Sequence, residues 1–204
     1  PETVALLVTG EETPRPGLAL SSGGSITELA LDLFDGAVVA PDGRWVGSLD
    51  GPRSETPGGV RIYGLANERT FTVPVASDYT IFGMAFDQAG TRLAFLEVGP
   101  PAPPAAPWQI AVVSLADGSV VRLSATQEQR RILPGFPLGW AGGGQALIIG
   151  TFVPYSEGGF QGVWALTVPP GATSAPVDGL GRRELLPEMS YRTEVRLTAA
   201  SNQL

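Results

Sequence analysis

A hairpin pattern that recurs along the chain constrains its fold more than any other feature. In residues 36–50, GAVVAPDGRWVGSLD, two apolar runs flank the turn Ala40-Pro41-Asp42-Gly43. Proline presets φ at the second turn position, aspartate suits the third, and glycine can take the positive φ that returns the chain. The pattern therefore predicts antiparallel strands at residues 37–40 and 44–49.

The same arrangement recurs at residues 83–98 and 138–152, where Gly90 and Gly144 stand in the place of Gly43. These glycines are 47 and 54 residues apart, in or near the range of propeller repeats of about 40 to 50 residues. A third apolar run follows each hairpin, at residues 59–66, 108–116 and 162–168. A fourth follows at residues 69–75 and 119–125 and, after a longer connection, in RRELLPE.

Four antiparallel strands per unit predict an all-β, β-propeller-like chain of four-stranded blades. The 27 glycines and 19 prolines, in a chain that is 43% hydrophobic, agree with many short strands joined by turns rather than with disorder. Tandem β-sandwich domains are the alternative, because short strands with turn signals are common to both architectures.

The predicted organisation is a single propeller-like domain over residues 1–204. It divides into a partial blade at 1–35, blades at 36–75, 82–125 and 137–190, and a closing strand or the start of a further blade at 191–204. Residues 3–10 and 25–31 are interpreted as the third and fourth strands of the partial blade. The chain is then either three full repeats with a split blade that closes a ring, or a segment of a larger propeller.

The first two units resemble the TolB-type or WD40-like "PDG" propeller repeats of bacterial envelope proteins, through APDGRWVGSLD…VRIYGLANERTFTV and FDQAGTRLAFLEV…QIAVVSLADGSVVRLS. The resemblance covers residues 36 to about 190 and is weaker in the third unit, where Ala141-Gly142-Gly143-Gly144 lacks the Pro-Asp pair. It implies that the strand before each turn is innermost. It specifies a fold better than a function, because propellers host many activities.

The chain has no cysteine, no histidine and no lysine, so all 13 basic residues are arginine. Thiolate nucleophiles, disulfides, Cys/His metal ligation and imidazole catalysis are therefore excluded for this chain alone. A net charge of −7 with scattered arginines argues against nucleic-acid binding. No apolar run is long enough to span a bilayer. A start at Pro1 without methionine suggests a processed product from which a leader or anchor has been removed, which fits an extracytoplasmic location in the periplasm or at the cell surface.

The two ends of the predicted blades differ in loop length. Second-to-third strand connections are long and irregular, at residues 50–59, 99–107 and 154–161, and fourth-to-first connections include 76–80 and 126–136. The opposite face has mostly tight turns. Because long loops are costly to order unless they are used, the long-loop face is the candidate binding surface. Its candidate partner-binding residues are arginines for carboxylates and aromatic anchors, namely Arg53, Arg130, Arg131, Tyr79, Tyr155 and Phe160.

Other conspicuous residues have structural interpretations. The four tryptophans occupy strand positions, where packing between blades is expected: Trp45, Trp108, Trp140 and Trp164. The proline-rich residues 99–107 are interpreted as a stiff loop. Asp32, Asp35 and Asp42 lack the ligand spacing of a calcium loop, and Asp42 already has a role in a turn. No metal, cofactor or catalytic site is predicted.

The sequence thus favours a non-catalytic protein–protein interaction or scaffold module, an accessory subunit of an extracytoplasmic assembly that binds another protein through the long-loop face. The alternative is a propeller associated with a hydrolase or peptidase, or a hydrolase that uses a pair of acidic residues. A gating propeller requires a hydrolase domain with serine and histidine, and a carboxylate pair meets only in the fold.

Overall fold

A computed structural model describes residues 3–8, 17–22, 25–29, 37–50, 58–67, 69–75, 78–100, 107–124, 133–141, 144–152, 160–168 and 182–186. They form four antiparallel sheets, each a meander whose strands lie in chain order. Sheet 1 holds β1 (Thr3–Val8), β2 (Gly17–Ser22) and β3 (Ser25–Leu29). Sheet 2 holds β4 (Val38–Val39), β5 (Trp45–Leu49), β6 (Gly59–Gly64) and β7 (Thr70–Pro74). Sheet 3 holds β8 (Thr80–Phe86), β9 (Arg92–Val98), β10 (Trp108–Ser114) and β11 (Val120–Ser124). Sheet 4 holds β12 (Leu133–Ala141), β13 (Ala146–Phe152), β14 (Phe160–Thr167) and β15 (Arg182–Leu186).

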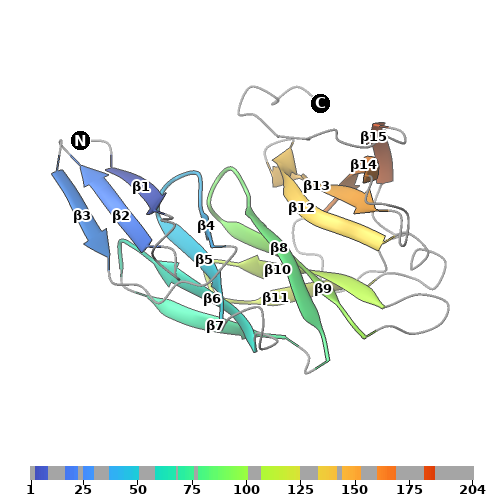
Figure 1. Ribbon diagram of the computed structural model, residues 1–204, viewed down its shortest axis with the longest axis horizontal. Coiled ribbons are helices and arrows are strands. Elements are labelled where there is room, and N and C mark those ends of the chain that lie inside the picture. The colour runs from blue at the N-terminus through green and yellow to red at the C-terminus, as the bar shows by residue number, and fades with distance from the viewer. Residues whose placement is uncertain are drawn as a thin grey trace.

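The sheets follow one another in an open series. Sheet 1 and sheet 4 lie at opposite ends, with sheets 2 and 3 between them (Figure 1). The first strands of sheets 2, 3 and 4 lie nearest one another, since β8 contacts both β4 and β12. This arrangement confirms the predicted all-β class with four-stranded antiparallel blades, although the sheets do not close into a ring.

The three predicted hairpins are confirmed residue by residue. The pairs Val39↔Val46, Phe86↔Leu93 and Trp140↔Leu147 occupy the same position before and after each turn. The turn glycines have positive φ, at 70° for Gly43, 62° for Gly90 and 89° for Gly144. Only glycine adopts this conformation without steric cost, so glycine recurs at this turn position in all three sheets.

Backbone hydrogen bonds outside the strands repeat with the same spacing. Leu65 N donates to Arg44 O at 2.8 Å, Leu115 N to Thr91 O at 2.9 Å, and Val168 N to Gln145 O at 2.9 Å. Each bond ties the end of the third strand to the residue after the first turn. The sequence repeat is therefore a structural repeat at the level of single hydrogen bonds.

The core lies between successive sheets. One cluster, between sheets 2 and 3, includes Leu49, Ile62 and Phe95, and a second, between sheets 3 and 4, includes Leu96 and Leu147. Since successive strand residues point to opposite faces, Phe95 and Leu96 enter different clusters. Each such fully buried side chain contributes roughly 1.5 to 3 kcal/mol. Sheet 3 is buried on both faces, which explains why its strands are almost uniformly apolar.

Two sequence expectations need correction. Residues 3–10 were expected to precede 25–31 as adjacent strands of a blade, but β2 lies between them and pairs with both β1 and β3. Residues 126–136 were expected to be a loop, but β12 begins at Leu133 in spite of Pro134 and Pro137. Its pairing register shifts at both prolines, because proline has no N–H to donate and is tolerated in a strand only at edges and bulges.

No helix that could cross a bilayer is found in the part of the chain that the structure describes.

Candidate functional site

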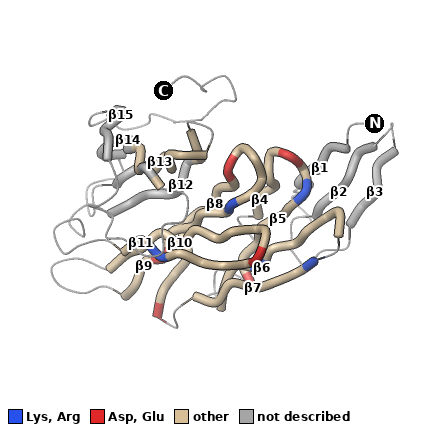
Figure 2. Tube along the Cα trace, turned by 180° about the vertical axis from the view of Figure 1, so that it is seen from behind, with Lys and Arg blue, Asp and Glu red and all other residues tan. Residues whose placement is uncertain are grey.

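The antiparallel meanders place the strand connections at two opposite ends of the sheets. The first and third connections of sheets 2 and 3 form the tight-turn face, which the structure describes at residues 40–44, 65–67, 69, 87–91 and 115–119. The second connections leave the opposite end, the long-loop face, which the structure describes at Asp50, Gly58, Gly99 and Pro107. In Figure 2 the charged positions lie mostly in the turns and at strand ends. The two ends therefore carry most of the polar chemistry of the described residues.

Side-chain caps close three turns of the tight-turn face. Asp42 Oδ1 accepts a hydrogen bond from Arg44 N at 3.0 Å, Asn67 Oδ1 from Arg69 N at 3.1 Å, and Asp117 Oδ1 from Ser119 N at 3.0 Å. These are Asx turns, in which the side chain mimics a backbone turn. They confirm the predicted turn role of Asp42; Asp32 and Asp35 lie outside the described residues.

Asp117 is the turn residue with the most perturbed acidity. The hydrogen bond from the Ser119 backbone N–H, followed by those from the Ser114 and Ser119 side chains, lowers the pKa of Asp117 to about 2. Asp117 is therefore ionised at any ordinary pH.

Arginines connect the turns of neighbouring sheets. Arg44 Nη2 donates to Ala89 O at 3.5 Å, and Arg69 Nη1 donates to Ala116 O at 2.8 Å. Arg92 Nη2 donates to Gly144 O. Donor and acceptor are 45, 47 and 52 residues apart, about one repeat. The guanidinium groups thus tie sheet 2 to sheet 3 and sheet 3 to sheet 4.

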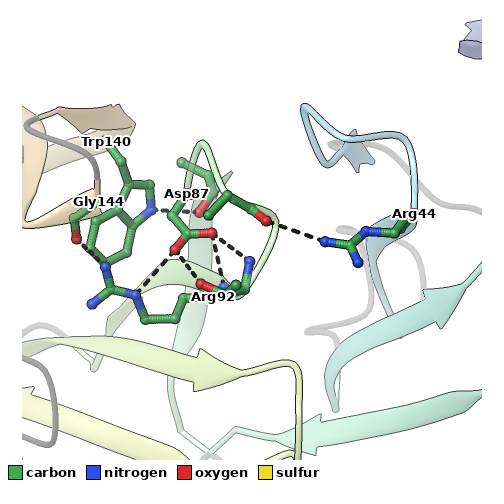
Figure 3. A network of polar contacts seen from close by, with 8 residues as sticks. Arg44, Asp87, Arg92, Trp140 and Gly144 are labelled. Carbon is green, nitrogen blue, oxygen red and sulfur yellow. Dashed lines mark hydrogen bonds and ion pairs between the residues drawn. The ribbon is translucent and has the colours of Figure 1, made fainter. Parts of the chain in front are cut away.

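The most extensive of these connections joins sheets 3 and 4 around Asp87, which is only 2% exposed (Figure 3). Its carboxylate accepts hydrogen bonds from Thr91 N and Thr91 Oγ1, both at 2.7 Å, and from Arg92 N at 3.0 Å. Arg92 Nε pairs with Asp87 Oδ2 at 3.3 Å, and the guanidinium lies 4.4 Å from the centre of the Trp140 ring. Trp140 Nε1 donates to Ala85 O at 3.0 Å.

A second buried carboxylate, Glu97, lies toward the long-loop face of sheet 3 and is 0% exposed. It accepts hydrogen bonds from Arg122 Nε at 3.0 Å and from Gln109 Nε2 at 2.5 Å. Arg122 Nη2 also donates to Pro74 O at 2.7 Å, so this ion pair extends to the outer strand of sheet 2. The ion pair offsets part of the cost of burying the carboxylate.

A further ion pair lies on the face of sheet 2 that is turned away from sheet 3. Arg61 donates to Asp50 and to the Tyr63 hydroxyl, the latter at 3.4 Å. The hydrogen bond to Tyr63, and then the attraction of Tyr63 and Asp50, raise the pKa of Arg61.

The ion pairs around Asp87, Glu97 and Arg61 stabilise the packing of strands and sheets, and their geometry is not that of a catalytic acid or base. A general acid or base needs access to the proton that it transfers. Asp87 and Glu97, the two buried carboxylates of the described residues, are instead enclosed and paired with arginines.

Of the predicted partner-binding residues, the structure describes the surroundings of Tyr79 alone. Tyr79 is half-buried and lies over Gly99, where an added Cβ would come within 3.2 Å of its Cζ and 2.7 Å of Pro107 Cγ. Phe160 begins β14, but its side chain is outside the described residues. So are four other candidates, Arg53, Arg130, Arg131 and Tyr155, and a common site formed by all six stays a prediction.

Three of the tryptophans pack between sheets as predicted. Trp45 packs against the core between sheets 2 and 3, where it meets Phe71 of its own sheet edge to face with ring centres 6.3 Å apart. Trp140 packs against the core between sheets 3 and 4, and Trp108, 5% exposed, lies within it. The Trp164 side chain lies outside the described residues.

Four arginines that join sheets, Arg44, Arg69, Arg92 and Arg122, and one exposed aromatic residue were not predicted from the sequence. Arg44, Arg69 and Arg92 follow turns, but their acceptors are backbone carbonyls about one repeat further along the chain, so no residue type in the sequence points to these contacts. Phe82, on the innermost strand β8, is 40% exposed. It precedes a register shift at Gly83, which has a φ of 60°.

Comparison with known proteins supports the architecture. No protein-family model matches the chain, and no curated protein sequence matches it. Among solved structures, hydrazine synthase from Kuenenia stuttgartiensis matches with a TM-score of 0.55 and 13% identity, over 81% of this chain and 49% of that one. Prolyl oligopeptidase B from Galerina marginata matches with a TM-score of 0.55 and 9% identity, over 86% of this chain and 28% of that one. The β-propeller domain of the Trilobed protease from Pyrococcus furiosus matches with a TM-score of 0.51 and 9% identity, over 93% of this chain and 56% of that one.

These similarities show the class of fold: the described sheets are blades of a β-propeller. The chain spans about half, or less, of the length of most of these neighbours, and their low identity shows the fold alone.

Proposed function

We propose that this chain is a non-catalytic interaction module that binds another protein through its long-loop face. The observation that carries the proposal is the pairing of Asp87 and Glu97 with arginines that continue into neighbouring sheets. Among the described residues, these buried charges stabilise the contacts between sheets and are not accessible to a partner. Recognition of a partner therefore falls to the loops, and the long-loop face offers the larger ones. Tyr79, packed over Gly99 and Pro107, is a rigid aromatic group at that face and suits the role of an anchor.

The same proposal includes the cellular location of the protein and its role in an assembly. We place the protein in an extracytoplasmic assembly, as an accessory subunit, on the strength of the resemblance of residues 36–75 and 82–125 to TolB-type repeats. In support, the turn glycines Gly43, Gly90 and Gly144 have the positive φ that the Pro-Asp-Gly turn pattern predicts.

The test compares the two faces in one assay. The tagged protein is cross-linked in its native host and the captured protein is quantified by mass spectrometry. Tyr79→Ala, and replacement of residues 51–57 by a Gly-Ser linker, should each reduce capture of a specific partner about tenfold. The control is Gln88→Ala, an exposed residue of the tight-turn face, which should leave capture unchanged. Equal capture by all three variants would refute a role for the long-loop face.

A second candidate, a propeller domain associated with a peptidase, is favoured by a specific observation. Two of the similar structures belong to peptidases, and the chain covers 28% and 56% of them. Such a domain would act beside a hydrolase domain, because this chain has no histidine for a catalytic triad. Sequencing the whole open reading frame decides between the two: a continuation past Leu204 into a domain with serine and histidine supports the peptidase, and its absence removes this candidate.

A further inference from the structure

Three residues form a row across sheet 3, one position beyond the ends of its strands. The last residue of β9 pairs with Thr80 of β8 on one side and with Trp108 of β10 on the other. One step further toward the long-loop face, the same register places Tyr79 and Pro107 on either side of Gly99. The backbone continues the ladder there, because Gly99 N donates to Pro107 O at 2.7 Å. We call these three residues the Tyr79 row.

The side chains of the Tyr79 row lie on the face of sheet 3 that is turned toward sheet 2. Side chains alternate along a strand, so residue 99 faces the same way as Glu97, two residues earlier. Glu97 lies on the side of sheet 2, because its partner Arg122 reaches the Pro74 carbonyl of β7. The Tyr79 row therefore lies at the long-loop end of the junction between sheets 2 and 3, next to the buried Glu97–Arg122 ion pair.

The middle position of the row has room for a glycine and for nothing larger. A Cβ at Gly99 would come within 2.7 Å of Pro107 Cγ and 3.2 Å of Tyr79 Cζ. The proline ring cannot turn away, because it is closed onto its own backbone. An aromatic ring that packs over a glycine of the neighbouring strand is a cross-strand contact that stabilises a sheet. The lack of a side chain at residue 99 thus lets both neighbours pack against its backbone.

We propose that Gly99 is a positioning residue for the Tyr79 anchor of the long-loop face. Because residue 99 carries no side chain, the Tyr79 ring packs on the sheet and is ordered before a partner binds. A recognition side chain that is already ordered loses less conformational entropy on binding, which raises affinity. This inference rests on the function proposed above and adds the residue that fixes the anchor in place.

The first experiment tests the row without any partner. The Gly99 amide donates to Pro107 O and the Tyr79 ring lies against the same residue, so hydrogen exchange of this amide reports whether the ring stays in place. Tyr79→Ala should speed exchange of the Gly99 amide about tenfold, as measured by NMR. The control is Thr80→Ala, an exposed neighbour whose side chain points to the opposite face and which should leave that exchange unchanged. Equal exchange in the two variants would overturn the proposal.

The second experiment measures what the position of the ring contributes to binding, with the cross-linking capture described above. Gly99→Ala should reduce capture about tenfold, as Tyr79→Ala does, because the displaced ring no longer fits its partner. In the Tyr79→Ala background the same change should have no further effect, since Gly99 acts through the ring. The control is Gly118→Ala on the tight-turn face, which carries a backbone cost at its φ of 78° but should leave capture unchanged.

A further variant covers the case in which Gly99→Ala folds poorly. Pro107→Ala adds no atoms and removes one side of the row, so it should reduce capture, though less than Tyr79→Ala does. Unchanged capture by Pro107→Ala would contradict the proposal in that case.

The outcomes separate this inference from the proposed function. Unchanged capture by Tyr79→Ala refutes the proposed function and the positioning role together. Loss of capture by Tyr79→Ala without loss by Gly99→Ala overturns the positioning role alone. Losses that add in the double variant also overturn it, because Gly99 would then act on binding independently of the ring.

Discussion

Glu97 shows how one residue decides the energetics of a sheet junction. It lies among apolar neighbours and is fully buried, yet its carboxylate meets Arg122 and Gln109 on the two following strands. Truncating a buried ion pair costs more than the pair contributes, because a charge is left without compensation.

Glu97→Ala should lower the free energy of unfolding by about 2 kcal/mol, because Arg122 and Gln109 both lose the acceptor of their hydrogen bonds, while the one-third exposed Arg122 remains hydrated. Urea denaturation measures the change. The control is Asp78→Ala, an exposed carboxylate shortly before β8, for which about 0.5 kcal/mol or less is expected. Equal effects of both substitutions would show that the buried pair is not stabilising.

Asp117 makes a pH-dependent contribution of predictable sign. Its folded pKa of about 2 lies below the ordinary value of 3.8, so the contribution is present above pH 3.8 and is lost as pH falls toward 2. Asp117→Ala should lower the unfolding temperature at pH 7, and the difference from the natural protein should shrink between pH 4 and pH 2. Thermal unfolding followed by circular dichroism at several pH values checks this. A difference that stays constant over that range would exclude the ionised carboxylate as its cause.

At the scale of single elements, the sequence repeat is most evident in the turns, each of which needs a glycine. Gly90 and Gly118 both have positive φ, at 62° and 78°, but their surroundings differ. A Cβ at Gly90 would overlap the Asp42 carboxylate of the neighbouring turn, whereas a Cβ at Gly118 would meet the Phe71 ring at an ordinary 3.6 Å.

Gly118→Ala should therefore cost about 1 kcal/mol, the backbone penalty alone. Gly90→Ala should cost roughly twice as much, because it also displaces Asp42 and disturbs the Arg44–Ala89 hydrogen bond. Chemical denaturation of the two variants provides the comparison. An equal loss in both would mean that the two neighbouring turns do not constrain each other.

At the scale of the whole molecule, stability should be highest in the middle of the series of sheets. Sheet 3 contributes to both apolar clusters, while the β4 strand of sheet 2 is only two residues long and half-buried. Native-state hydrogen exchange should find the slowest amides in β9 and β10 and faster ones in β4, since opening of the central sheet requires loss of both clusters. Faster exchange in β9 than in β4 would contradict this order.

Local features of the fold could be read from the sequence because they depend on neighbouring residues. The turns at Gly43, Gly90 and Gly144 and the strands that flank them are determined by φ preferences and alternation within about fifteen residues. The strand β2 was not predicted, because its apolar run Leu18–Leu20 is only three residues long and its pairing with β1 and β3 is visible only in the structure. The start of β12 escaped because the prolines at 134 and 137 obscure a strand that pairs on one side.

The sequence by itself determined the hairpins, their glycines and the repeat, because these follow from backbone sterics and from the two-residue period of a strand. Only the tertiary structure decided which charges are buried and which sheets they join. Arg44, Arg69, Arg92 and Arg122 donate to backbone carbonyls 45 to 52 residues away. Every residue carries such a carbonyl, so an acceptor of this kind leaves no mark in the sequence, and only the stacking of one sheet on the next brings donor and acceptor together.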